Sequence, residues 1–207
     1  IKTKNSNDFL PIIDELIGEF SYITSKENLL FFYSTYDAPN GKIMSLDVEQ
    51  NSFIWDDIIS ENVMPIRSAN IINNKIIITY LNDTLSDIQI YDLNGQLEKG
   101  LDLGLKGSIS GFGGSIDDTK TYFSFSNYIT PKEIYSLDLT NFQTELFWKE
   151  ELESFSSSEY STKLEFYKSK DGTNVPIHIS YKTGIEVDSS TPILLYGYGG
   201  FDISILP

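Results

Sequence analysis

The chain has 207 residues, of which 40% are hydrophobic and 14% aromatic, and its 30 acidic and 15 basic residues give a net charge of −15. This composition is typical of a globular protein and excludes a disordered chain. No apolar run approaches the ~20 residues that span a bilayer, and an acidic surface repels phosphate groups, so we expect neither a membrane nor a nucleic acid as partner.

Three similar units of about 45 residues follow one another along most of the chain. In each unit a hydrophobic strand and a polar turn precede a strand that ends in aspartate, and a further apolar or alternating run follows. Asn40-Gly41, Asn73-Asn74 and Asn94-Gly95 supply turns, because these residue types accept a positive φ. The expected strands are Leu29–Ser34, Ile43–Asp47, Phe53–Ile59, Lys75–Leu81, Ile88–Asp92, Leu97–Leu103, Thr121–Ser126, Ile134–Asp138 and Thr144–Trp148.

Several short strands in each unit of about 45 residues are typical of a β-propeller blade. A β-sandwich also has closely spaced strands, but it gives no reason for a repeated strand–aspartate–strand unit. Propellers close with about 4–8 blades, so about three blades indicate a partial propeller. We expect Asp8–Leu16 to be the outer strand of a preceding blade, and the chain to be entered partway through a protein, without a signal peptide.

The repeat ends after Trp148, and a polar, serine-rich segment over 149–162 predicts a domain boundary. Beyond it, Leu164–Lys168 and Val175–Tyr181 alternate in polarity and flank an Asp-Gly turn, which predicts a hairpin. Ile193–Tyr196 is continuously apolar, as expected of a strand buried on both faces of a mostly parallel sheet. Such a strand followed by a glycine-rich loop indicates an α/β sheet with its ligand site at that end.

The loop after this strand, Tyr196-Gly197-Tyr198-Gly199-Gly200-Phe201, is the most suggestive candidate site in the sequence. A tyrosine hydroxyl is a hydrogen-bond donor at neutral pH and can stabilise the oxyanion of a tetrahedral intermediate. The alternative is that the tyrosines pack and the glycines make a turn. Spacing alone does not decide between the two interpretations.

Other motifs in the chain point away from independent chemistry. Gly107–Gly111 resembles a nucleophile elbow, but Ile109 stands where the serine must be. The single histidine, His178, lies in an alternating strand, where we expect a packing or surface role. The absence of cysteine, together with one histidine, excludes a zinc site in practice. Gly111–Gly114 lacks the rest of a phosphate-loop fingerprint, and we expect no cofactor.

The aspartates at the repeat positions, Asp47, Asp92 and Asp138, fall one in each unit. A calcium site needs several oxygen ligands gathered together, so turn and strand-end roles are the better interpretation. We therefore expect no metal site.

Several segments together resemble the prolyl oligopeptidase family. The specific part is Tyr196–Phe201, supported by Lys170–Thr173 and Val175–Ile177 and, more weakly, by Ala38-Pro39 and Thr130-Pro131 in the repeats. The resemblance runs from about Asp8 to Pro207. It implies a β-propeller that caps an α/β-hydrolase domain, in a serine peptidase that cleaves short peptides after proline by means of a Ser-Asp-His triad.

On this resemblance, the fold class is mainly β: a partial propeller of about three blades, followed by the first strands of an α/β-hydrolase domain. Residues 1–152 would be the C-terminal part of the propeller, and 153–207 the truncated N-terminal part of the peptidase domain. Tyr198 matches the family's oxyanion-hole tyrosine, and Phe201 matches an aromatic residue that lines the pocket for the proline ring. The triad lies outside this chain, so we expect the chain alone to be inactive.

The resemblance also names partners: short proline-containing peptides, and the missing parts of the chain's own propeller and hydrolase domain. The lack of cysteine fits the family's expected cytoplasmic location. The alternative is a propeller module without chemistry of its own that binds a partner protein, because fold does not fix function.

Overall fold

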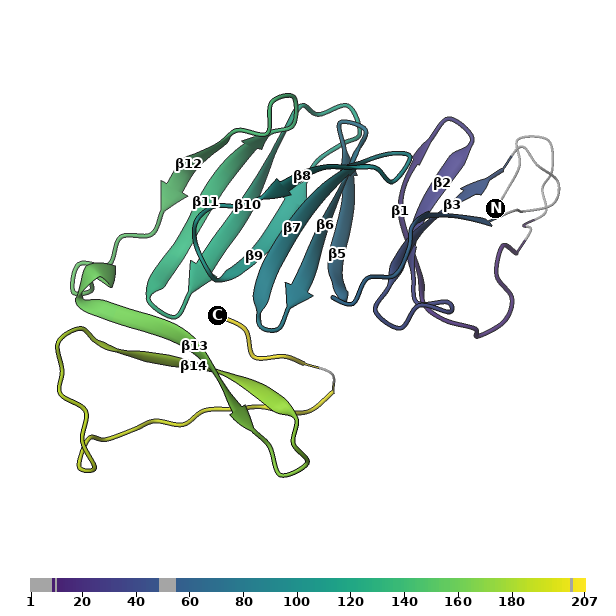
Figure 1. Ribbon diagram of the computed structural model, residues 1–207. Coiled ribbons are helices and arrows are strands. Elements are labelled where there is room, and N and C mark those ends of the chain that lie inside the picture. Colours follow the sequence, from purple (N-terminus) through teal and green to yellow (C-terminus); the bar gives the residue numbers. More distant parts are fainter. Residues whose placement is uncertain (1–8, 10, 49–54, 202) are drawn as a thin grey trace.

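The computed structural model describes residues 9, 11–48, 55–201 and 203–207. These residues form three four-stranded sheets and one two-stranded hairpin, all antiparallel (Figure 1). In every sheet the strands lie side by side in their order along the chain, which is the topology of propeller blades.

The first sheet contains β1 (Phe20–Lys26), β2 (Leu29–Ser34), β3 (Lys42–Asp47) and β4 (Trp55–Ile59). The second contains β5 (Ile66–Ile72), β6 (Lys75–Asn82), β7 (Leu85–Asp92) and β8 (Leu97–Leu101). The third contains β9 (Ser108–Gly113), β10 (Lys120–Asn127), β11 (Thr130–Asp138) and β12 (Thr144–Lys149). A short 3-10 turn (Ser157–Glu159) then precedes the hairpin of β13 (Tyr160–Lys168) and β14 (Asn174–Lys182).

The predicted propeller repeat is confirmed. Each blade contains four strands, one more than the sequence predicts. Three strands of each blade were expected, and each is present within a few residues of its predicted bounds. Phe53–Ile59 is seen as Trp55–Ile59, because residues 53 and 54 lie outside the described part of the chain. The first strand of each blade was missed, because β1 and β9 are rich in polar residues and glycine and present no continuous apolar pattern.

The three blades stack face to face, so the middle blade is buried on both sides. Ile76, Ile78 and Tyr80 of β6 belong to the cluster shared with the first blade, whereas Ile77 belongs to the cluster shared with the third. Successive residues of a strand point to opposite faces, so one continuous apolar run fills two interfaces. Each of these four side chains is at most 1% exposed.

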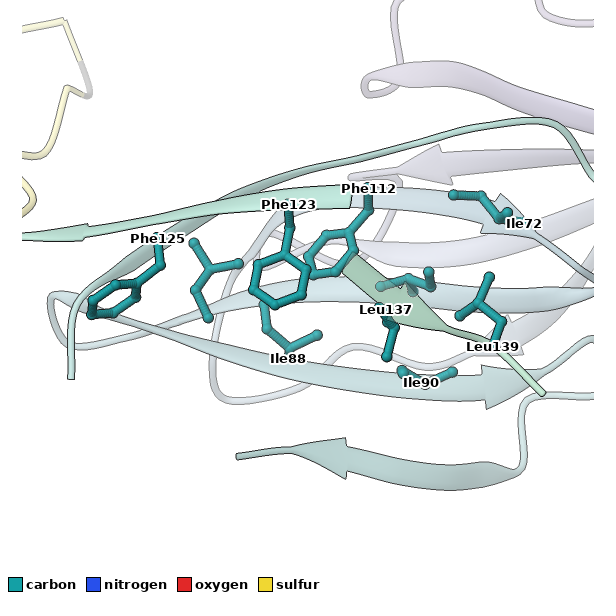
Figure 2. Packing of buried hydrophobic residues seen from close by; sticks show 10 residues of the cluster. Ile72, Ile88, Ile90, Phe112, Phe123, Phe125, Leu137 and Leu139 are labelled. Atoms are coloured by element: carbon teal, nitrogen blue, oxygen red, sulfur yellow. The ribbon is translucent and has the colours of Figure 1, made fainter. Parts of the chain in front are cut away.

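The interface between the second and third blades is built around aromatic rings (Figure 2). The rings of Phe112 and Phe123 stack with centroids 4.9 Å apart, and Tyr135 stacks on Phe123 at 5.5 Å. Ile88 and Ile90 of β7 pack against this group from the second blade. Burial of such side chains stabilises the stack by about 1.5–3 kcal/mol each.

The turns between strands follow local side-chain chemistry. Asn73 and Asn74 have φ of +50° and +56° and make the two-residue turn between β5 and β6, as predicted. Asn40-Gly41 instead ends a longer loop: the Asn40 amide side chain donates to the Asn62 carbonyl at 3.0 Å, which ties the first blade to the following connection.

Two of the repeated aspartates, Asp92 and Asp138, have the predicted turn role. The Asp92 carboxylate accepts hydrogen bonds from the Gln96 and Asn94 amides at 2.8 and 2.9 Å, and these bonds hold its pKa below the usual value. Asp138 accepts in the same way from the Thr140 hydroxyl and amide, which again lowers the pKa. The residues that follow Asp47 and Val48 lie outside the described part.

Two predicted strands are wrong. Ile193–Tyr196 is not a strand but an extended segment without regular structure, in which Leu194 is 93% exposed. A strand needs neighbours that take its backbone hydrogen bonds, and no strand of the described residues lies beside this one. Asp8–Leu16 is also not a strand over its described residues, of which only Phe9 makes an isolated bridge; Pro11 removes a backbone donor there.

The hairpin β13–β14 is confirmed, with an unbroken register from Tyr160↔Lys182 to Lys168↔Asn174. No parallel α/β-hydrolase sheet is seen among the described residues, so the division at residues 152 and 153 stays a prediction. Within the described residues, no helix has the length and apolar character to cross a membrane.

Candidate functional site

The Tyr198 loop lies in the extended segment that follows β14, beneath the blades in Figure 1. The Tyr198 side chain is 49% exposed and folds back over Gly200, where a Cβ would meet the tyrosine hydroxyl oxygen at 3.4 Å. The Ile203 amide donates to the Gly200 carbonyl at 3.1 Å and closes a turn. The loop therefore adopts a bend in which Gly200 makes room for the Tyr198 ring.

The Tyr198 hydroxyl has no hydrogen-bond partner among the residues that the structure describes, so it is available as a donor to an incoming acceptor. Phe201 occupies the left-handed region with φ +54° and is 92% exposed. The two rings make no ring-to-ring contact within the described part. The structure brings both predicted residues to one turn but builds no enclosed pocket around them, and their roles stay predictions.

Two hollows of the described surface lie away from this loop. One cavity of about 260 Å³ lies against the first blade and is lined by Phe20, Tyr36 and Trp55 with the segment 12–17. Another, of about 460 Å³, is lined by Glu133, Lys149 and the acidic residues of the segment 150–153, beside the predicted domain boundary. Neither cavity includes a residue of the Tyr198 loop.

The motif Gly107–Gly111 is structural, as its sequence indicated. Ile109 and Phe112 of β9 are 9% and 0% exposed and belong to the core between the second and third blades. The Ser110 hydroxyl pairs with the Ser124 hydroxyl of the neighbouring strand at 3.0 Å. No general base stands beside these serines in the described residues, so they have no means of activation as nucleophiles.

His178 has the packing role expected of it and joins the hairpin to the blades. Its Nε2 lies 2.7 Å from the Thr84 hydroxyl of the β6–β7 turn, and its ring centroid is 5.0 Å from that of Tyr128 in the β10–β11 turn. Desolvation lowers the pKa of His178 below its usual value. Thr84 and Tyr128 could not be found from sequence, since nothing but their turn positions sets them apart.

No group of three or more His, Cys, Asp or Glu side chains in the described part of the chain is placed to hold a metal ion. The candidate site therefore consists of Tyr198 as a hydrogen-bond donor, Phe201 as an exposed aromatic surface, and the contact through His178 that places the hairpin under the blades.

Comparison with known proteins agrees with the predicted propeller repeat. Residues 1–150 match the family model described as "Prolyl oligopeptidase, N-terminal beta-propeller domain". The chain is 34% identical over 205 residues to a prolyl endopeptidase of Elizabethkingia meningoseptica and 30% identical over 217 residues to one of Dictyostelium discoideum. Each match covers 99% of this chain, but the chain spans only 29% and 28% of the length of these relatives.

Solved structures show the same fold. One from a study of two prolyl endopeptidases superimposes with a TM-score of 0.89 and 25% identity, over 99% of this chain and 30% of its own. Another, prolyl oligopeptidase B of Galerina marginata bound to a 35-residue substrate of hydrolysis and macrocyclization, superimposes with a TM-score of 0.87 and 22% identity, over 95% of this chain and 28% of its own.

Proposed function

This chain belongs to the prolyl oligopeptidase family, and on that premise we propose that it supplies blades and part of the peptidase domain to a serine-type endopeptidase that hydrolyses short peptides on the carboxyl side of proline. The observation that carries the proposal is the similarity to relatives named prolyl endopeptidase along 99% of the chain. Because the chain spans 29% of their length, the activity is proposed for the whole protein.

In this proposal residues 1–152 belong to the propeller and 153–207 open the α/β-hydrolase domain. The separate pairing of β13 with β14, outside every blade, supports the division. So does the exposure of Ile193, Leu194 and Leu195, which are 81%, 93% and 80% exposed. A continuous apolar run of this kind gains stability when other strands cover both of its faces.

We assign Tyr198 the role of oxyanion donor and Phe201 that of a wall of the proline pocket. A phenol hydroxyl aimed at the carbonyl oxygen of the substrate donates more strongly as negative charge develops there, which lowers the barrier to acyl transfer. In this family assignment the nucleophile, general base and orienting acid belong to the rest of the enzyme. The one histidine here is held against Thr84. The chain alone therefore has no covalent route and is inactive.

The test is Tyr198→Phe in the whole enzyme, assayed with a chromogenic peptide that carries proline before the scissile bond. Loss of one oxyanion donor costs about a hundredfold or more in well-studied hydrolases, and we expect kcat to fall by about tenfold at least. Tyr196→Phe, which removes the neighbouring hydroxyl of the same motif, is the matched control and leaves kcat unchanged. Equal kcat in wild type and Tyr198→Phe removes Tyr198 from the mechanism.

We propose as partners short proline-containing peptides and the remaining parts of the propeller and hydrolase domain, and as compartment the cytoplasm, which fits the absence of cysteine. Native mass spectrometry tests the assembly. Further chains bound to this one, and activity that appears with them, support the proposal. Cleavage of a proline peptide by the pure 207-residue chain contradicts the assigned division of the chemistry.

A further inference from the structure

The hairpin β13–β14 contacts the blades through the only histidine of the chain. His178 of β14 contacts Thr84 in the β6–β7 turn and Tyr128 in the β10–β11 turn. Figure 1 shows the hairpin beneath this end of the blades. The Thr84 hydroxyl lies 2.7 Å from Nε2, and the Tyr128 ring lies against the imidazole at an interplanar angle of 56°. One titratable side chain thus contacts two different blades.

The surroundings of His178 favour the neutral imidazole. Desolvation by the two turns lowers the pKa of His178 and, on the other side of the contact, raises that of Tyr128. An imidazolium held in this place loses part of its hydration and gains only a hydroxyl as polar partner. The contact with the Tyr128 ring offers the cation some compensation, but a cation–π contact at a partly exposed site is weak.

The neighbouring charged residues of the β6–β7 turn and of the paired strand are exposed or point away from this contact. From the β6–β7 turn, the exposed Asp83 stands next to Thr84 in the chain. From the paired strand, Leu164 lies opposite His178 in the register. Its neighbours Lys163 and Glu165 point to the other face of the hairpin, where they form an ion pair at 3.0 Å. Asp83 is exposed, so solvent and salt screen its charge.

We propose that His178 is a pH-sensitive latch, which holds the hairpin against the blades while the imidazole is neutral and releases it when the imidazole is protonated. The latch is a property of the contact between the two parts of the chain and does not depend on the peptidase chemistry. Its partner groups are the Thr84 hydroxyl and the Tyr128 ring.

The direction of the pH effect follows from linkage. The docked hairpin has the lower pKa for His178, and the free hairpin has the ordinary value of about 6.5. Docking is therefore strongest above this pH and weakens as the pH falls below it. Between a pH above both pKa values and a pH below both, the docking constant drops tenfold for each unit by which docking lowers the pKa.

The experiment is a proton NMR titration of the 207-residue chain between about pH 8 and pH 5, in which the single imidazole gives an unambiguous signal. We expect a midpoint below that of free histidine. The nuclear Overhauser contact between the His178 and Tyr128 rings is present at pH 8 and lost with the same midpoint. A midpoint at or above about 6.5, or a ring contact that persists at pH 5, overturns the proposal.

Two variants separate the latch from a merely structural contact. Thr84→Val keeps the shape of the side chain but removes the hydroxyl that pairs with the docked imidazole. Because the hairpin then docks less often, we expect the His178 midpoint to rise toward the value of the free hairpin, about 6.5. His178→Phe keeps a ring beside Tyr128 and has no titration, so the amide signals of the two blade turns no longer shift in this pH range. If those signals still shift in His178→Phe, or if Thr84→Val leaves the midpoint unchanged, the latch is wrong.

Discussion

Two apolar runs of the chain, Ile76–Ile78 in the middle blade and Ile193–Leu195 near the C-terminal end, have opposite environments. The isoleucines of β6 are 0%, 1% and 0% exposed, whereas Ile193, Leu194 and Leu195 are 81%, 93% and 80% exposed. Both runs lack the alternation of a half-buried strand, and both predict a strand that is covered on two faces.

The two runs differ in the strands and blades that lie beside them. β6 has β5 and β7 beside it in its own sheet, and a blade packs on each of its faces. The segment at 193–195 has no paired strand within the described residues. A continuous apolar run therefore predicts a strand that is buried on both faces. The strand forms only where other strands pair with it and other parts of the protein pack on its faces.

The largest contrast is expected from truncating one side chain in each run. Ile78→Ala opens a cavity between the first two blades and is expected to lower the free energy of unfolding by about 2–5 kcal/mol. Leu194→Ala changes a side chain that is already in solvent, so its effect is expected to stay within about 0.5 kcal/mol. Urea unfolding of both variants measures the difference. Similar losses in the two variants would mean that 193–195 is buried in solution.

A smaller contrast comes from two glycines with nearly the same positive φ. Gly95 has φ +81° and Gly172 has φ +86°. A Cβ on Gly95 would lie 2.0 Å from the Ile58 carbonyl oxygen of the first blade, whereas nothing lies within 4 Å of one on Gly172.

Gly172→Ala is therefore expected to cost only the strain of a left-handed alanine, about 1–2 kcal/mol. Gly95→Ala adds the displacement of a blade contact, about 1–3 kcal/mol more. Thermal unfolding of the pair tests this expectation. Equal costs would show that the blades separate at this contact without loss of stability.

The smallest effect, and one of opposite sign, is expected at buried hydroxyls in the blades. Thr79 is 3% exposed and its hydroxyl has no hydrogen-bond partner among the described residues, so Thr79→Val is expected to stabilise the fold by about 1 kcal/mol. The Thr121 hydroxyl donates to the Gly113 carbonyl at 2.9 Å, and Thr121→Val is expected to destabilise by about 1 kcal/mol. Chemical denaturation of both variants measures the sign of the change in the free energy of unfolding. Destabilisation by Thr79→Val contradicts the burial of an unpaired hydroxyl at this position.

Local sequence signals account for the parts of the fold that could be predicted. Lys75–Leu81 carries its apolar run and is preceded by Asn73-Asn74, which can take positive φ, so the strand and its turn are both specified within a few residues. β9 could not be predicted in the same way. Its residues Ser108–Gly113 resemble a loop, and its place in the sheet depends on pairing with β10.

The same distinction between local signals and distant contacts applies to the candidate site. Tyr198 and Phe201 stand in one short motif, so the sequence places them close together, whereas their roles stay predictions. The partner of His178 could not be predicted, since Thr84 is 94 residues away in the sequence and is an ordinary turn residue. Contacts of this kind depend on how the hairpin and the blades are placed, and no local pattern encodes that placement.

The order of strands within each blade also has a consequence for how the chain folds. Each sheet is completed by consecutive strands, over 20–59, 66–101 and 108–149, so every hydrogen-bonded ladder joins neighbours in the sequence. Low contact order within a unit favours rapid formation of that unit. On a ribosome that releases the chain from its N-terminus, the first blade can therefore form before the second is synthesised, and each later blade can use the exposed face of its predecessor as a template.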